Sequence, residues 1–344
     1  MTGRAITDQA MASKAEILAA IERAHDGNAR KIARALLDAF ESIRDALSLS
    51  ELETLLRERP GQVVRLIDAL PIENLLAPAG AEIAAAAFVG AELTASLQAP
   101  VLNPQGQAIN FVFNVANPRV GPYAERISAR RVREVSEGVR QVVRDIVRTE
   151  VPAGINPRDT ARRIRGSIGL TARQERAVSN FRRMLEEGDR QALDRALRDK
   201  RFDGSIRRAI AGEKELSAAQ IDKMVNRYRE RYIKYRSEVI GRTEAIRALS
   251  GGGDEYIRSQ VDAGLIDARQ VRREWVVTRD DKLRDDHRAI PRLNPDGVGL
   301  DEPFAYPGGT IRYPGDPNAP VAMTAQCRCA NFVRVLSPEL VGLA

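Results

Sequence analysis

The residues best suited to chemistry lie in a C-terminal stretch that runs from Trp275 to Cys329. His287 is one of two histidines in the chain, and Cys327 and Cys329 are its only cysteines. Imidazole nitrogen, thiolate sulfur and a carboxylate such as that of Asp280 are ligands that bind zinc, and four of them complete a tetrahedral site. If the stretch folds back on itself, it predicts a structural metal site of these four residues.

The sequence leaves alternatives for two features of this site. The fourth ligand can be any of four nearby carboxylates, which are Asp280, Asp281, Asp285 and Asp286. In a simpler interpretation, both cysteines lie in a strand with one of them buried, and His287 is hydrogen-bonded to a neighbouring carboxylate. A disulfide between cysteines separated by one residue is disfavoured by strain, and a reducing cytoplasm disfavours it further.

Glu244 and His287 offer an alternative, acid–base chemistry in a nucleic-acid-modifying or transferase enzyme. The sequence contains no nucleophile elbow, phosphate-binding loop or paired-carboxylate spacing that would support it. Arg242 and Glu244 are two residues apart, so they do not share a helix face. We therefore expect the protein to act by binding, with Trp275 as a core anchor.

A long loop must bring the metal-site residues together. Residues 291–320 hold seven of the 17 prolines of the chain and five glycines, which excludes a helix and favours an ordered loop. A metal would cross-link the two ends of this loop. Apolar runs at 271–278 and 332–335 predict strands on either side of it.

Elsewhere the apolar spacing predicts helices, and the fold class is mainly α. Aromatic residues make up only 5% of the chain, so the cores must consist mostly of Ala, Leu, Ile and Val. The triplet Gly251-Gly252-Gly253 is expected to end a helix, because glycine is a poor helix former. The expected order is a helical region at 1–100, a linker or extended arm at 101–122, a basic helical part at 123–253, a small α+β module with a small sheet and a long loop at 254–336, and a tail at 337–344.

Positive charge is concentrated in the middle of the chain. Residues 119–250 carry 32 Lys+Arg against 19 Asp+Glu, whereas the whole chain has a net charge of +7. This excess predicts a polyanion partner for this segment, and the alternative is a set of solvated helix faces. Any binding of a nucleic acid by such helices should be non-specific and salt-dependent. The candidates for phosphate contact are Arg130, Arg131, Arg133, Arg140, Arg144, Arg148, Arg162, Arg163 and Arg165.

No membrane association is expected from the apolar pattern. The N-terminus lacks the apolar core of a signal peptide. The longest apolar run is 83–91, which is about half of the roughly 20 residues that a spanning helix needs.

Several short motifs together resemble one family, the Mu F-like head morphogenesis proteins, which are minor head proteins of tailed bacteriophages. The resemblance covers roughly residues 120–335 and depends on the order and spacing of its parts. In chain order these parts are Gly169-Leu170-Thr171-Ala172-Arg173-Gln174, Arg242-Thr243-Glu244, Trp275 with Thr278 and Asp280, Arg284 with His287, Phe304, and Cys327-Arg328-Cys329.

The resemblance implies a protein present in few copies in the phage head. Such a protein associates with the portal vertex and packaged DNA and acts in head assembly or genome delivery. Its implied partners are the portal protein, the major capsid or scaffold protein and double-stranded DNA. Its location is the virion, with the host cytoplasm during assembly. Arg242, Thr243, Glu244 and Trp275 become structural motif residues.

Overall fold

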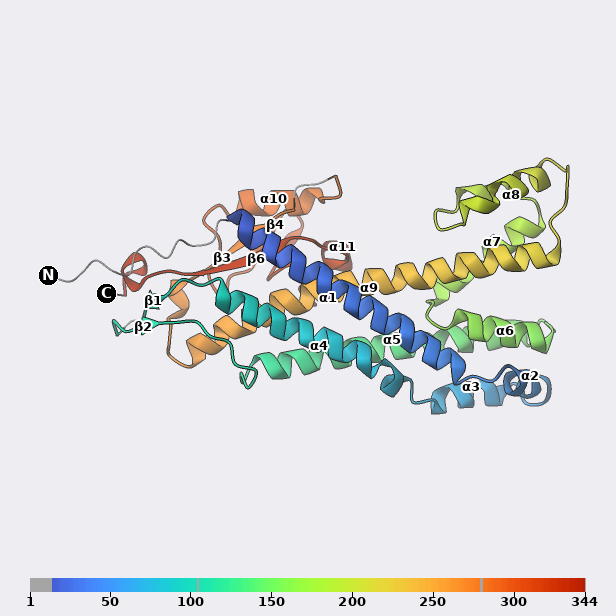
Figure 1. The fold of residues 1–344 in the computed structure, drawn as a ribbon, viewed down its shortest axis with the longest axis horizontal. Coiled ribbons are helices and arrows are strands. Elements are labelled where there is room, and N and C mark those ends of the chain that lie inside the picture. Colours follow the sequence, from blue (N-terminus) through green and yellow to red (C-terminus); the bar gives the residue numbers. More distant parts are fainter. Residues whose placement is uncertain (1–13, 104, 279–280, 344) are drawn as a thin grey trace. The chain divides into compact units, whose positions relative to one another are not determined.

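The computed structural model describes residues 14–103, 105–278 and 281–343 and is mostly helical, which confirms the expected fold class (Figure 1). Its helices are α1 (Lys14–Asp45), α2 (Leu49–Glu58), α3 (Gly61–Ala69), α4 (Ile72–Ser96), α5 (Val120–Glu150), α6 (Pro157–Ser167), α7 (Ala172–Glu186), α8 (Asp203–Ile210), α9 (Ala218–Asp262), α10 (Asp285–Leu293) and α11 (Val321–Thr324). Its strands are β1 (Val101–Leu102), β2 (Ala108–Ile109), β3 (Val271–Val276), β4 (Phe304–Tyr306), β5 (Gly309–Ile311) and β6 (Ala330–Val335).

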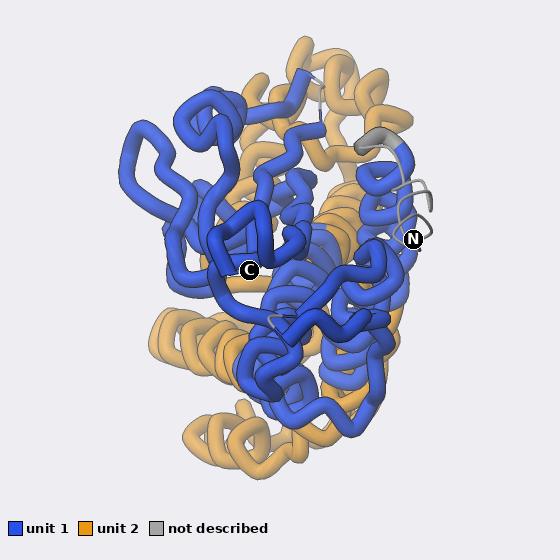
Figure 2. The backbone as a smooth tube through the Cα atoms, turned by 90° about the vertical axis from the view of Figure 1, so that its left-hand side faces the viewer, with its two compact units in different colours: residues 1–32, 80–130, 239–344 blue, residues 33–79, 131–238 orange. Residues whose placement is uncertain are grey.

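The chain divides into two compact units, which Figure 2 shows in different colours. Unit 1 consists of residues 1–32, 80–130 and 239–344, and unit 2 of residues 33–79 and 131–238. The long helices α1, α4, α5 and α9 each contribute residues to both units. The expected N-terminal region, 1–100, therefore supplies parts of both units.

The described part of unit 1 holds three two-stranded sheets, β1–β2, β3–β6 and β4–β5, and the β3–β6 sheet confirms the two strands expected around the loop. β3 and β6 pair antiparallel, with Trp275 opposite Asn331. Alternate residues of β3 are buried, as the period of a strand with one covered face requires. One apolar cluster of unit 1 joins this sheet to helices α4 and α9, through Ala91, Tyr256 and Val271 among others. A second cluster surrounds Trp275.

The glycine triplet does not end a helix, so that prediction is wrong. Helix α9 continues through it to Asp262. A Cβ atom added at Gly252 would lie 2.0 Å from the carbonyl oxygen of Ala87, and one added at Gly90 would lie 2.1 Å from that of Leu249. Helices α4 and α9 therefore touch backbone to backbone within unit 1, and only glycine allows this approach. Tertiary contact here outweighs the low helix propensity of glycine.

A buried arginine holds the proline- and glycine-rich loop. Arg273 is 1% exposed, and burial lowers the pKa of its guanidinium. Its guanidinium lies 3.5 Å from the carboxylate of Asp254 and donates to the carbonyl oxygens of Gly299 at 3.1 Å and Arg312 at 2.8 Å. It also donates to the carbonyl oxygen of Glu302. This network orders the loop whether or not a metal is present.

Unit 2 forms helices where capping residues predict them. Thr171 and Gln174 form a capping box at the start of α7, and Asn156 caps α6. Gly169 precedes α7 with φ = 93° and lies against the ring of Phe40, so both its conformation and its surroundings call for glycine. These residues belong to the first motif of the resemblance or border it.

Helix α4 is long and apolar enough, by length and composition alone, to cross a membrane. In the structure, 44% of its most apolar window is buried. Ala91 and Ala95 belong to the apolar cluster of unit 1 that contains Tyr256 and Ile257. A core helix passes the same test, and these contacts are those of a core helix.

Candidate metal centre

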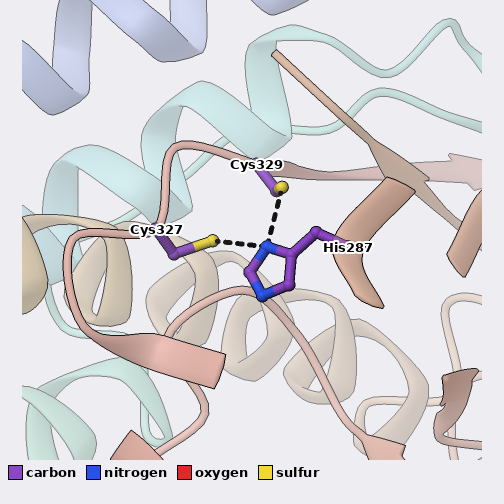
Figure 3. A group of neighbouring side chains, drawn as sticks. All are labelled: His287, Cys327 and Cys329. Atoms are coloured by element: carbon purple, nitrogen blue, oxygen red, sulfur yellow. Dashed lines mark hydrogen bonds between the residues drawn. The ribbon is translucent and has the colours of Figure 1, made fainter. Parts of the chain in front are cut away.

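Figure 3 shows both cysteine side chains directed at the same ring nitrogen of His287. The Nδ1 atom lies 3.3 Å from the Sγ atom of Cys329 and 3.6 Å from that of Cys327. His287 comes from the first turn of α10, and the cysteines come from the segment between α11 and β6. All three residues are 2% exposed or less. The structure thus brings together three of the four predicted ligands.

The other ring nitrogen of His287 fixes the tautomer. Nε2 lies 2.9 Å from the carbonyl oxygen of Met323, which can only accept a hydrogen bond. Nε2 therefore carries the proton, and the lone pair of Nδ1 points at the two sulfurs. The alternative in which a carboxylate binds His287 is wrong for the contacts described, because its partners are a carbonyl group and two thiols. This backbone contact also orients the ring as the outer contacts of metal-bound histidines do.

The spacing of the three atoms fits a tetrahedral zinc site. Zn–S bonds of about 2.3 Å and a Zn–N bond of about 2.0 Å at tetrahedral angles separate nitrogen from sulfur by about 3.5 Å. The observed separations are 3.3 and 3.6 Å. The ligand atoms of His287, Cys327 and Cys329 all lie within 4.8 Å of one another, which is close enough to hold a metal ion. Among the described residues, no other group of His, Cys, Asp and Glu side chains does so.

The two thiols are electrostatically unequal. A hydrogen bond from the thiol of Cys329 lowers the pKa of Cys327, and the positive charge of Arg284 acts in the same direction against burial. The same hydrogen bond, together with burial, raises the pKa of Cys329 well above its usual value. Cys327 is therefore the cysteine of the pair that gives up its proton more readily. A divalent cation would displace this proton.

Three side chains from the motifs of the resemblance hold the cysteine segment in place. The hydroxyl oxygen of Thr243, on α9, accepts a hydrogen bond at 3.1 Å from the N–H of the residue before Cys327. Arg284 donates to the carbonyl oxygen two residues before Cys327. The hydroxyl group of Thr278 lies 2.8 Å from the carbonyl oxygen of Arg328. Positions far apart in the chain therefore converge on one short segment.

Gln326, the residue that Thr243 anchors, has φ = 54°. Among the described residues it is the single non-glycine position with positive φ. This conformation is unfavourable for a side chain with a Cβ atom and persists only where neighbours impose it. It turns the chain immediately before Cys327.

Trp275 supports the metal centre as a packing residue. It is 3% exposed, and its ring meets those of His287 and Phe304 edge to face, with centroids 5.6 and 5.4 Å away. Both cysteines belong to the same apolar cluster as Trp275. The expected role of Trp275 as a core anchor is confirmed.

No described carboxylate belongs to the ligand group of His287, Cys327 and Cys329. Asp280 lies outside the described residues. Asp281, Asp285 and Asp286 are exposed and do not belong to the ligand group. A cavity of about 20 Å³ reaches His287 and Cys329, which is room for about one water molecule. A fourth ligand of that size fits.

Glu244 does not belong to the ligand group and is a buried residue of α9. It is 0% exposed, and both of its carboxylate oxygens accept hydrogen bonds from Arg247, at 2.9 and 3.0 Å. Arg247 also donates to the carbonyl oxygen of Gly315, so this ion pair links α9 to the loop.

The arginines proposed for DNA binding fall into two groups. Several are tied down within unit 2: Arg140 pairs with Glu73, Arg144 with Asp68, and Arg163 with Glu150 and Glu175. These contacts have a structural role, and the Arg140 pair holds the pKa of Glu73 at about 2. Arg131 pairs with Glu134 and is largely buried, and Arg165 binds the carbonyl oxygen of Arg44. The exposed members are Arg130, Arg133, Arg148 and Arg162, of which Arg148 pairs with Asp145 and Arg162 with Asp159 on the helix surface.

The other histidine of the chain, His25, is buried as well. An isolated histidine on a polar helix is usually a surface residue, but His25 is 4% exposed. Its Nε2 atom lies 3.1 Å from the carbonyl oxygen of Arg242. The signal was present in the sequence, since His25 follows Ile17 and Ile21 at helical spacing and so shares their apolar face.

A cavity of about 680 Å³ opens beside the cysteine segment, within unit 1. Its walls come from α1, α9, the segment after β3 and the cysteine segment. The lining residues are Ile21, Glu22, His25, Asp26, Arg242, Ile246, Thr278, Lys282, Arg284, Gln326 and Arg328.

Comparisons with protein family models, with curated proteins and with solved structures found no match for this chain.

Proposed function

We propose that this chain is a minor head protein of a tailed bacteriophage, which acts by binding in head assembly or genome delivery. The observation that carries the proposal is the convergence of Thr243, Thr278, Arg284 and His287 on the segment of Cys327 and Cys329. These are four of the residues on which the resemblance to Mu F-like proteins depends, and their meeting at one segment supports the proposal.

In this proposal the C-terminal module is a rigid docking piece. Zinc bound by His287, Cys327 and Cys329 would cross-link α10 to the cysteine segment, and its role would be structural, with Asp280 or a water molecule as fourth ligand. The partners would be the portal protein and the major capsid or scaffold protein. The protein would reside in the head, after assembly in the host cytoplasm.

The proposal is tested by quantitative mass spectrometry of purified phage particles, before and after their DNA is released. A virion component should be present at a few copies per portal ring. Departure with the DNA would support a delivery role, and retention would support an assembly role. Absence of the chain from both particles and assembly intermediates would contradict the proposal.

DNA contact belongs to the same proposal and rests on the exposed arginines of unit 2. Replacing Arg133, Arg148 and Arg162 together by glutamine should weaken binding to duplex DNA about tenfold at low salt, because each lost phosphate contact lowers the salt slope by about 0.9. The measurement is a fluorescence anisotropy titration over a range of salt concentrations.

A control variant with the same loss of charge is available in unit 2. Arg34, Arg57 and Arg65 are exposed and lie on helices outside the basic segment. Their replacement by glutamine should leave the salt slope unchanged. If both triple variants lose affinity equally, net charge rather than this surface attracts DNA.

A further inference from the structure

The large cavity beside the cysteine segment combines four cationic side chains from three parts of the chain. Arg242 lies on α9, Lys282 and Arg284 lie just before α10, and Arg328 lies between the two cysteines. Arginine presents a planar set of donors that matches the oxygen atoms of phosphate. Cations gathered at a concave surface with low-dielectric walls strengthen one another's attraction for an anion.

Two of these cations have no carboxylate partner among the described residues. The guanidinium of Arg284 donates to a backbone carbonyl group, and the side chain of Arg242 forms no ion pair within the described part of the chain. Other arginines of unit 1 do pair with a carboxylate, as Arg258 does with Asp254.

The two carboxylates that line the cavity are already engaged. Glu22 lies 3.1 Å from the hydroxyl group of Thr278, and Asp26 lies 3.2 Å from the ring nitrogen of His25. They therefore do not neutralise Arg242 or Arg284 by direct pairing. The cavity keeps an excess of positive charge at its Arg242 and Arg284 side.

We propose that this cavity binds a phosphate-bearing ligand of nucleotide size, with Arg242 and Arg284 as its principal phosphate contacts. A volume of about 680 Å³ lies in the range of small-molecule sites and exceeds what a single phosphate ion fills. Among the described lining residues there is no Phe, Tyr or Trp, and the ring of His25 is buried and bound to the carbonyl oxygen of Arg242, so no large platform for base stacking is present. Recognition should therefore depend on phosphate and be indifferent to the base.

The site is tested by calorimetric titration of the full chain with pyrophosphate, ATP, dTTP and a short blunt-ended DNA duplex. ATP and dTTP should bind with similar affinity, and Arg242→Gln should weaken both about tenfold, the usual effect of losing one charged hydrogen-bonding partner. Arg292→Gln is the matched control, because Arg292 is exposed on α10 and does not line the cavity. Fluorescence of Trp275, the only tryptophan, verifies that each variant is folded.

The duplex identifies the source of the phosphate. If Arg242→Gln weakens duplex binding as well as ATP binding, the cavity accepts the phosphates of DNA. If duplex binding is unchanged, the ligand is a free nucleotide. Absence of binding to all four probes, an equal effect of Arg292→Gln, or a tenfold preference between ATP and dTTP would overturn the assignment.

Discussion

Replacing Cys327 by serine should abolish zinc binding and lower the melting temperature of unit 1 by roughly 10 °C. The buried Cys327, Cys329 and Nδ1 of His287 meet at the spacing of a tetrahedral site. Zinc at a thousand times its dissociation constant stabilises a folded state by about 4 kcal/mol, and each kcal/mol shifts the melting temperature of a unit of this size by about 2–4 °C. Trp275, packed on His287, provides the fluorescence signal.

A chelator separates metal binding from simple packing. Chelation should lower the melting temperature of the unmodified protein to that of Cys327→Ser and leave the variant unaffected. Met323→Leu is the matched control: it changes volume little inside the same apolar cluster, keeps the carbonyl group that binds His287, and should retain zinc. An unmodified protein that contains no zinc and ignores the chelator would refute the metal centre.

The affinity for zinc is also expected to depend on pH. Zinc binds thiolates, so its affinity should fall as the pH falls and the cysteines take up protons. The lowered pKa of Cys327 extends binding to lower pH, whereas the raised pKa of Cys329 makes release of its proton the costlier step.

Replacing Gly252 by alanine should destabilise unit 1 by about 2 kcal/mol or more, although alanine is the better helix former. The gain in helix propensity is about 1 kcal/mol. Against it, the new Cβ atom would lie 2.0 Å from the carbonyl oxygen of Ala87, and backbone cannot swing aside as a long side chain can. Forcing the helices apart costs up to about 3 kcal/mol and also strips apolar contacts around Tyr256.

Gly27 provides the matched control on another helix that contributes to unit 1. It lies inside α1, and an added Cβ atom meets nothing within 4 Å. Gly27→Ala should therefore stabilise the protein by about 0.5–1 kcal/mol. Urea unfolding followed by Trp275 fluorescence measures both variants. Equal, small effects of the two substitutions would show that the close approach of α4 and α9 is not needed.

The helices and their beginnings could be predicted from local sequence. Asn156 and Thr171 start helices because their side chains satisfy backbone N–H groups within a few residues. The strands at 271–276 and 330–335 lie where the apolar runs at 271–278 and 332–335 predicted them. Such signals are local, so they survive without knowledge of the partner that each element meets.

The ligand types could be predicted, but their convergence could not. A count of histidines and cysteines pointed to His287, Cys327 and Cys329, and their chemistry pointed to zinc. Three features depend on contacts between distant parts of the chain. The carbonyl group of Met323 orients the ring of His287, and Thr243 binds the backbone before Cys327. Arg140 pairs with Glu73 and is therefore not free for DNA. No sequence period encodes such contacts.

By itself, then, the sequence determined the helical class, the capped helix starts, the strands around the loop and the residue types of the candidate metal site, because each follows from local pattern or from composition. Only the tertiary structure decided that Gly252 lies inside a helix, that His287 meets the two cysteines, and that Arg242 and Arg284 line one cavity. The physical reason is that packing energies between elements exceed the local preference of a glycine or a histidine, and they appear only when the elements meet.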